Sequence, residues 1–223
     1  IASPCYGGKN DTCFTLSLMY SSLYMYKERM SLQCILHPSG SLLAYERNLI
    51  FSKFMESDAT HILCIDSDIG WDHEAPMKLL KYNRDIVGGL YPMRSHDGEY
   101  KYPFHPVETD IKTDGRLLEV QALPFGFVMI SKNALQRMHE FYEELKYRMN
   151  DSEGYGLCTL ENINGKFFGE DYTFSYRARK AGLNIWCDPD LNLTHLGKTG
   201  NFLEVLKNDH NLVGDGHEIF STN

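Results

Sequence analysis

The sequence has no apolar run of the roughly 20 residues that a membrane-spanning helix needs, and it is short of positive charge. Lys and Arg together number 22 against 30 Asp and Glu, which gives a formal net charge of −8 at pH 7. Binding to the phosphate backbone of nucleic acids requires a basic surface, so neither nucleic acid nor a membrane span is expected. One phosphorylated small molecule held through a metal ion remains compatible with this charge.

Paired cysteines are absent too. The six cysteines include no Cys-x-x-Cys spacing, which argues against a zinc ribbon or a dithiol redox motif. Cys34, Cys64 and Cys187 fall in apolar strand-like runs, where a free cysteine behaves as a small hydrophobic residue. We therefore expect reduced, structural thiols in a reducing compartment such as the cytoplasm.

No internal repeat or low-complexity linker divides the 223 residues. A hydrophobic content of 43% and a charged content of 23% are typical of a globular domain, and the length suffices for one well-buried core. We expect a single domain over 1–223, with the last ~20 residues as a peripheral tail.

The first half of the chain alternates strand-like and helix-like segments. The pattern predicts strands at 1–5, 32–36 (closed by His37-Pro38), 62–65 and 85–90, and helices at 11–29, 41–55 and 74–82. In the first helix, Leu16, Met19, Tyr20 and Leu23 share one face. Such alternation predicts an α/β domain with a Rossmann-like, mostly parallel sheet flanked by helices.

The second half is less regular. Residues 94–118 lack a clear period and predict a long loop with room for a hairpin, and loops of that length are usually functional. Further on, the pattern predicts strands at 118–123, 127–130, 184–187 and 191–194, helices at 132–149 and 171–181, and a polar loop at 150–165.

Asp66 and Asp68 are the most informative pair of side chains. They follow the apolar run 62–65, and because side chains alternate along a strand, both carboxylates would point the same way. Two carboxylates at a strand exit can share a hard divalent cation, which could hold the phosphates of a nucleotide. The alternative is a solvated turn or a helix cap. A second Asp-x-Asp at 188–190 shows that the tripeptide alone is weak evidence.

Other polar groups follow predicted strands, at 6–9 and 195–198, or begin a helix, at 170–171. Ligands of open α/β sheets bind at the carboxyl ends of the strands, so we expect these groups to converge on the two aspartates. His195 could complete a cation's shell, and an imidazole suits Mn²⁺ better than Mg²⁺. Its alternative is a hydrogen-bonded surface histidine.

Glu170 and Asp171 open a predicted helix, where acids are favoured by the helix dipole alone. The functional interpretation is a general base that takes a proton from an acceptor hydroxyl, a role we assign to Asp171. Arg47 lies mid-helix and could either face a nucleotide or pair with an acid one turn away. Lys198 and Arg94 are candidate diphosphate contacts or solvated surface charges.

Together, four segments resemble the metal-dependent GT-A glycosyltransferases: 64–68 (CIDSD), 124–130 (PFGFVMI), 169–182 (GED through AG) and 194–197 (THLG). The order and spacing match that family over nearly the whole chain. The small size and the segment 85–92 look most like the compact glycosyltransferases of large algal viruses, which act on capsid glycans.

The resemblance implies a nucleotide-sugar donor, UDP-sugar favoured, bound over Mn²⁺ or Mg²⁺, and a glycan or glycoprotein acceptor. The implied cation ligands are Asp66, Asp68 and His195, and the implied nucleotide contacts are Pro4, Tyr6, Gly7, Arg47, Asp66, Ser67 and Lys198. Asp171, with Glu170 beside it, would be the base of an inverting, single-displacement transfer, and a retaining enzyme stays open.

Two rival functions remain. An aspartate-nucleophile phosphatase also carries Asp-x-Asp after a buried strand, but it places the motif near the chain start and has Thr or Val where Gly70 stands here. A non-catalytic nucleotide- or sugar-binding module on the same fold differs only in lacking the proposed base, Asp171.

Overall fold

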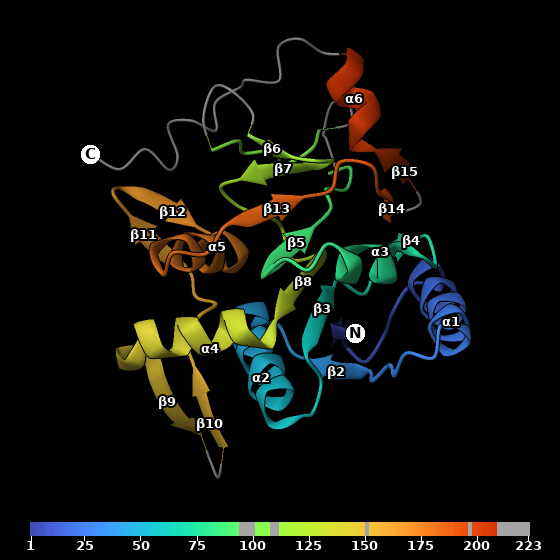
Figure 1. The fold of residues 1–223 in the computed structure, drawn as a ribbon. Helices are drawn as coiled ribbons and strands as arrows, with labels where there is room; N and C mark the ends of the chain where they lie inside the picture. Colours follow the sequence, from blue (N-terminus) through green and yellow to red (C-terminus); the bar gives the residue numbers. More distant parts are fainter. Residues whose placement is uncertain (94–100, 108–111, 150–151, 196–197, 209–223) are drawn as a thin grey trace.

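An eight-stranded sheet forms the centre of the fold, with strand order β2-β1-β3-β8-β5-β13-β7-β6 (Figure 1). The computed structural model describes residues 1–93, 101–107, 112–149, 152–195 and 198–208. The central strands are β1 (Ala2–Tyr6), β2 (Ile35–Ser39), β3 (His61–Ile65), β5 (Ile86–Gly88), β6 (Thr113–Asp114), β7 (Leu117–Val120), β8 (Phe127–Ser131) and β13 (Ile185–Cys187).

The sheet is mixed. β1 pairs in parallel with β2 and β3, and β5 with β13, whereas β8 runs antiparallel between β3 and β5. The predicted α/β class is therefore confirmed. Six of the eight strands (β1, β2, β3, β5, β6 and β13) run in one direction, and β7 and β8 run against them, so the sheet is mostly but not wholly parallel. Because Phe127 pairs with Ile65, β8 begins at the edge where β3 ends, which brings the turn before β8 next to Asp66.

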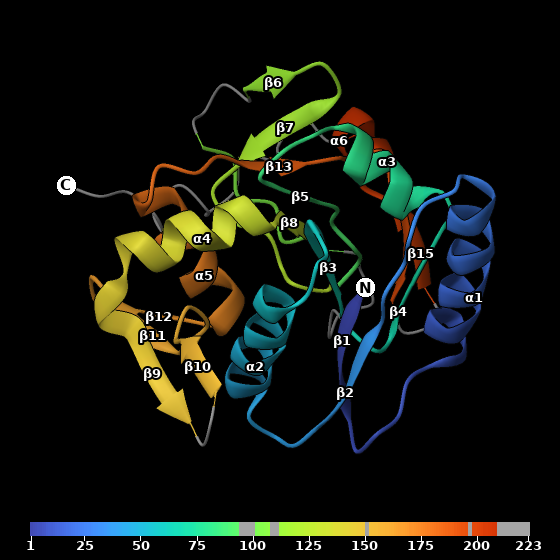
Figure 2. The ribbon, with the colours of Figure 1, turned by 60° about the horizontal axis from the view of Figure 1, so that its bottom comes forward.

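Helices cover both faces of the sheet. They are α1 (Thr12–Lys27), α2 (Leu43–Glu56), α3 (Ala75–Lys81), α4 (Lys132–Phe141), α5 (Glu170–Lys180) and α6 (Phe202–Asn208). Figure 2 shows α2, α4 and α5 together on one side of the sheet and α1 with α3 on the other. None of the helices in the described ranges is long and apolar enough to cross a membrane.

The alternation along β3 explains this two-layer cover. Ile62 and Cys64 point into one core with α2, α4 and α5, while Leu63 and Ile65 point into a second core with α1 and α3. A strand that is buried on both faces reads as a continuous apolar run rather than an alternating one. The predicted strand at 62–65 is confirmed.

A small second sheet, β15-β14-β4, places His195. It consists of β4 (Ile69–Trp71), β14 (Asn192–His195) and β15 (Lys198–Asn201), and His195 pairs with Ile69 in its antiparallel register. Ile69 directly follows Asp68, so this pairing brings the histidine to the two aspartates across more than a hundred residues of chain.

Three boundary predictions were wrong. The strand predicted at 32–36 lies at Ile35–Ser39 and includes Pro38, which an edge strand tolerates because one side of its backbone needs no partner. The helix predicted over 132–149 ends at Phe141, and the polar loop predicted at 150–165 contains strands. A 3₁₀ turn (η1, Glu143–Leu145) and two hairpins replace them: β9 (Lys146–Met149) with β10 (Ser152–Tyr155), and β11 (Glu161–Ile163) with β12 (Lys166–Phe168).

Candidate functional site

A cavity of about 640 Å³ opens at the carboxyl ends of β1 and β3. Its polar lining comes from the turn after β3, the start of α5 and the end of β14, and consists of Asp66, Ser67, Asp68, Asp171, Tyr172 and His195. Its apolar lining consists of Pro4, Leu43, Tyr91, Met93, Pro103 and Pro124. Of the groups expected to converge, Asp171 and His195 join the two aspartates in this lining, whereas residues 6–9 do not.

The turn that carries the two aspartates is held on three sides by backbone hydrogen bonds. The Asp66 amide donates to the Gly126 carbonyl (3.3 Å), and the Ile69 amide donates back to the Asp66 carbonyl (3.1 Å). The amide of Asp11, at the start of α1, donates to the Ser67 carbonyl (2.8 Å). Because the backbone is fixed in this way, the carboxylates are presented to the cavity without a separate ordering step.

His195 is oriented by its second ring nitrogen. Its Nδ1 lies 2.9 Å from the Pro92 carbonyl, which can only accept, so Nδ1 carries the proton. Nε2 then faces a carboxylate oxygen of Asp68 at 3.4 Å. The hydrogen bond with Asp68 raises the pKa of His195 above its usual value, although burial acts in the opposite direction. An imidazole whose Nδ1–H is held by a carbonyl while Nε2 is directed at a carboxylate has the orientation that metal-binding histidines show.

Asp66 takes a different partner. Its carboxylate accepts a hydrogen bond from the guanidinium of Arg47 (2.9 Å), and Nε of Arg47 lies 3.2 Å from the carboxylate of Glu170. Arg47 is only 4% exposed and also lies over the ring of Phe125. Burial lowers the pKa of this guanidinium, but the two carboxylates outweigh burial and raise it. Arg47 thus sits behind the cavity as the bridge between two acids.

The three-ligand metal site is formed only in part. In the described part of the chain, no group of three or more His, Cys, Asp or Glu side chains is arranged to hold a metal ion. The reason is the turn of Asp66 toward Arg47, which leaves Asp68 and His195 as the adjacent pair. This pair has the donor atoms that suit Mn²⁺, and the metal itself stays a prediction.

Asp171 lines the cavity at the first turn of α5, beside Glu170. Burial raises the pKa of Asp171 to about 6, the charge of Glu170 adds to the rise, and Arg47 and the Tyr172 amide act against it. That amide donates to the Asp171 carboxylate (2.8 Å) and fixes its orientation. A carboxylate with a pKa this near neutrality is suited to accept a proton during a reaction.

Tyr91 is a lining residue that the sequence pattern marks only as the end of a strand. Its ring packs edge-on against His195, with the centroids 5.1 Å apart. A Cβ at position 126 would collide with the Tyr91 ring, so only glycine fits there. Gly126 therefore serves two purposes, since its carbonyl also holds Asp66. The signal in the sequence is an aromatic residue at a strand exit, which is too common to single out.

Not all of the predicted nucleotide contacts reach the cavity. Pro4 and Ser67 line it. Tyr6, the last residue of β1, is 70% exposed, and Gly7 turns the chain with φ of +60°; neither of them is in the lining. Arg47 does not pair with an acid one turn away on its own helix, because its two partners are Asp66, in the turn after β3, and Glu170, at the start of α5. Its contact with a nucleotide stays a prediction. Lys198 has its backbone in β15, but its side chain lies outside the described residues, as does all of Arg94.

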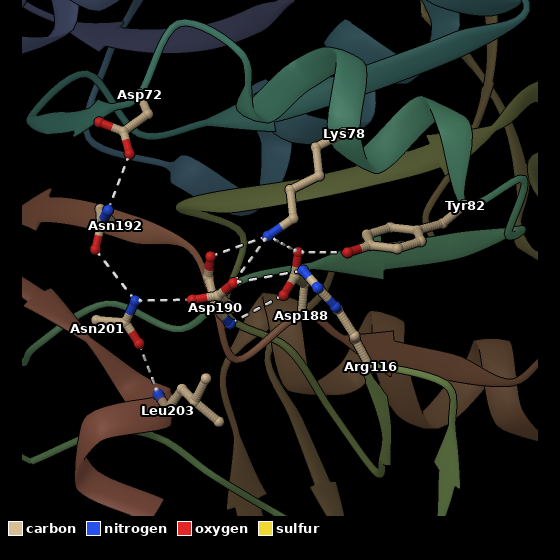
Figure 3. A network of polar contacts seen from close by, with 9 residues as sticks. All are labelled: Asp72, Lys78, Tyr82, Arg116, Asp188, Asp190, Asn192, Asn201 and Leu203. Carbon is tan, nitrogen blue, oxygen red and sulfur yellow. Dashed lines mark hydrogen bonds and ion pairs between the residues drawn. The ribbon is translucent and has the colours of Figure 1, made fainter.

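The second Asp-x-Asp has a structural role (Figure 3). Asp188 is fully buried and lies 2.8 Å from Nζ of Lys78, while Tyr82 donates to it at 2.9 Å. Asp188 also accepts from the amide of Asp190 (2.9 Å), and Asn201 donates to the Asp190 side chain (3.3 Å). These contacts join α3 to the segment between β13 and β15, well apart from the cavity lining.

A larger cavity, of about 730 Å³, lies at the opposite edge of the sheet. It is lined by residues at the amino ends of the strands, among them His61, Asp85 and Asn184. Asp85 there accepts hydrogen bonds from Ser131 and Arg137. The carboxylate of Asp85 is thus engaged by local contacts, and the smaller cavity, where several acids and a histidine meet, is the better candidate site.

No protein-family model and no curated protein sequence matches this chain. Among solved structures, the chain is similar to the protein described as "Crystal Structure of A197 from STIV". The two share 14% sequence identity with a TM-score of 0.49, over 87% of this chain and 84% of that one. A similarity of this size carries no functional argument, so the function rests on the site itself.

Proposed function

We propose that this protein is a metal-dependent glycosyltransferase of the GT-A type. It would move a sugar from a nucleotide-diphosphate donor, with a UDP-sugar favoured, to a hydroxyl of a glycan or glycoprotein. The observation that carries the proposal is the joint placement of Asp68, His195 and Asp171 around one cavity at the carboxyl ends of the strands. Enzymes of open α/β sheets bind their ligands at this edge.

The cation, Mn²⁺ or Mg²⁺, would be held by Asp68 and His195, and when bound it would supply positive charge against the diphosphate. Asp66 has another task in this proposal. Because Arg47 holds it, Asp66 would accept a hydrogen bond from the nucleotide rather than ligate the metal. The apolar wall formed by Pro4 and Leu43 would lie against the flat face of the base.

Asp171 would act as the general base. The acceptor hydroxyl gives its proton to the Asp171 carboxylate while its oxygen bonds to the anomeric carbon of the sugar. The bond from that carbon to the diphosphate oxygen breaks at the same time, and the diphosphate leaves with the electron pair. One displacement inverts the anomeric configuration, which NMR of the product would report. Retention in the product would overturn the role of Asp171 as base.

The test begins with donor binding. Thermal unfolding of the protein is measured with UDP-, GDP- and TDP-sugars, with Mn²⁺ or with a chelator, because a ligand stabilises the folded state in proportion to its binding. We expect one donor class to raise the melting temperature only with the metal present. No response to any donor would contradict the proposal.

The second step separates an enzyme from a binding module. In Asp171→Asn, transfer and donor hydrolysis are expected to fall by about 100-fold or more, while metal-dependent binding of the nucleotide survives. Glu74→Gln, at an exposed carboxylate just before α3, is the matched control and should retain full turnover. Unchanged turnover in Asp171→Asn would refute the assignment of the base, and binding without turnover in the unmodified protein would favour the module.

A further inference from the structure

Helix α1 carries short polar side chains on its inward face. Ser17 accepts from the backbone amide of Trp71 (2.9 Å) and donates to its carbonyl (2.8 Å), and Ser21 accepts from the Trp71 indole (2.9 Å). Phe14 and Met25 complete the buried face. The helix is therefore attached to β4 largely through hydrogen bonds to one tryptophan, an arrangement that uses only a minor part of its apolar surface.

The outward face of α1 is more apolar than the inward one. The residues predicted to share a face do share it, but they point to solvent. We call the set the α1 stripe; its members are Leu16, Met19, Tyr20, Leu23 and Tyr26. Their exposed fractions run from 46% for Leu16 to 82% for Tyr26. A contiguous exposed apolar patch of this kind marks an interaction site.

The spacing of the α1 stripe specifies the shape of its partner. Leu16, Met19, Leu23 and Tyr26 follow one another at intervals of three, four and three residues. This alternation is the a/d spacing of a helix that packs along a second helix, with one narrow seam between them. A partner with a flat surface would be matched by a broader apolar face on α1. The narrow α1 stripe therefore fits a second helix that has the same a/d spacing.

We propose that this second helix is α1 of another copy of the chain, packed antiparallel in a twofold-symmetric dimer. Charge at the two ends of the helix favours this direction: Asp11 precedes the first turn, whereas Lys27 in the last turn and Arg29 just past it outnumber Glu28 between them. With Met19 of one copy opposite Leu23 of the other, Asp11 comes within about one helical turn of Arg29 across the seam. A parallel pairing would place like charges and like dipole ends together.

The size of the α1 stripe agrees with a modest dimer. If each of its large side chains offers roughly 150–200 Å² when fully exposed, the observed fractions leave on the order of 600 Å² per copy for contact. A standard interface buries about 800 Å² per partner. The α1 stripe supplies most of that area as its centre, and tyrosine and methionine are among the residues enriched in such centres. Dissociation in the micromolar range is expected.

The test is sedimentation velocity of the full chain from about 1 to about 300 µM. We expect a monomer–dimer equilibrium in the unmodified protein. Leu23→Glu, which puts a charge in the middle of the seam, should raise the dissociation constant by roughly 30-fold or more. The matched control is Leu160→Glu, because Leu160 is 59% exposed against 60% for Leu23 and precedes the β11–β12 hairpin on the far side of the fold (Figures 1 and 2). Both variants should melt like the unmodified protein.

A charge reversal tests the direction of packing. Lys27→Glu together with Arg29→Glu should weaken the dimer several-fold, and the addition of Asp11→Lys should restore it. A protein that stays monomeric at the highest concentration overturns the proposal, as does equal weakening by Leu23→Glu and Leu160→Glu. A monomer that instead binds phosphatidylcholine vesicles through Leu23 also overturns it, because the occupant would then be a lipid surface.

Discussion

At the scale of single residues, the buried Arg47 decides how the acids of the site are used. Two carboxylates, Asp66 and Glu170, share its charge. Burial, and after it the charge of Glu170, raises the pKa of the neighbouring Asp171, while Arg47 acts in the opposite direction. Arg47 is therefore paired with two of the acids, and the third acid has a raised pKa.

Replacement of Arg47 should be costly for stability. Arg47→Ala leaves two carboxylates without their counter-charge in a largely buried place, and we expect a loss of about 3–5 kcal/mol in the free energy of unfolding, measured by urea denaturation. Arg137→Ala is the control, since its pair with Asp85 is exposed and should contribute less than about 1 kcal/mol. Equal losses in the two variants would contradict the bridging role of Arg47.

Asp171 should make the stability of the fold depend on pH in a particular sense. Its folded pKa of about 6 lies above the ordinary value of 3.8, so the folded state binds more protons between these values than the unfolded state does. Stability therefore falls as the pH rises from about 4 to about 6, since the unfolded state releases its proton first.

The variant Asp171→Asn cannot ionise, and it should remove this dependence. At pH 7.5 we expect Asp171→Asn to be more stable than the unmodified protein by about 1–3 kcal/mol, and at pH 4 the two should be equal. Urea denaturation at both pH values measures the difference. A variant that is less stable at pH 7.5 would show that the carboxylate is not under the burial that shifts its pKa.

At the scale of elements, sequence patterns predicted those segments that are buried on one or both faces. The strands at β3 and β8 and the helices α2 and α5 appear at or near their predicted ranges, because apolar periodicity reports burial directly. The hairpins β9–β10 and β11–β12 were missed, since their strands are short and face solvent, and the pattern of Lys132–Phe141 continues into β9 without a breaker.

The site could be predicted to the same extent. Asp66, Asp68, Asp171 and His195 were identified from their positions after strands and at a helix start, and the cavity brings them together. The two partners of Arg47 could not be predicted from the sequence, because they depend on contacts among α2, the turn after β3 and α5 that no local pattern encodes. Tyr91 was missed for the same reason, since its place depends on a glycine 35 positions away.

At the scale of the whole molecule, the two Asp-x-Asp segments differ in their surroundings. Asp66-Ser67-Asp68 lines the candidate cavity, with Asp66 paired to Arg47 and Asp68 beside His195. Asp188-Pro189-Asp190 ties α3 to the small second sheet and to α6, whose Leu203 amide donates to the Asn201 side chain at 2.9 Å (Figure 3). The same Asp-x-Asp pattern therefore occurs in two different environments, and the residues around each segment determine which contacts its carboxylates make.

This difference predicts opposite effects for two equivalent substitutions. Asp188→Asn removes the buried negative charge that pairs with Lys78, and should lower the free energy of unfolding by about 2–3 kcal/mol. Donor binding, measured at low temperature, should be unchanged. Asp68→Asn, at a partly exposed side chain, should change stability by less than about 1 kcal/mol and yet abolish the metal-dependent rise in melting temperature with donor. Both quantities come from one thermal unfolding series with and without Mn²⁺ and UDP-sugar. The opposite result would place the ligand in the network of Figure 3: Asp68→Asn would keep the metal-dependent rise in melting temperature, and Asp188→Asn would lose it without any loss of stability. The reason is that only groups that touch the donor can couple its binding to folding.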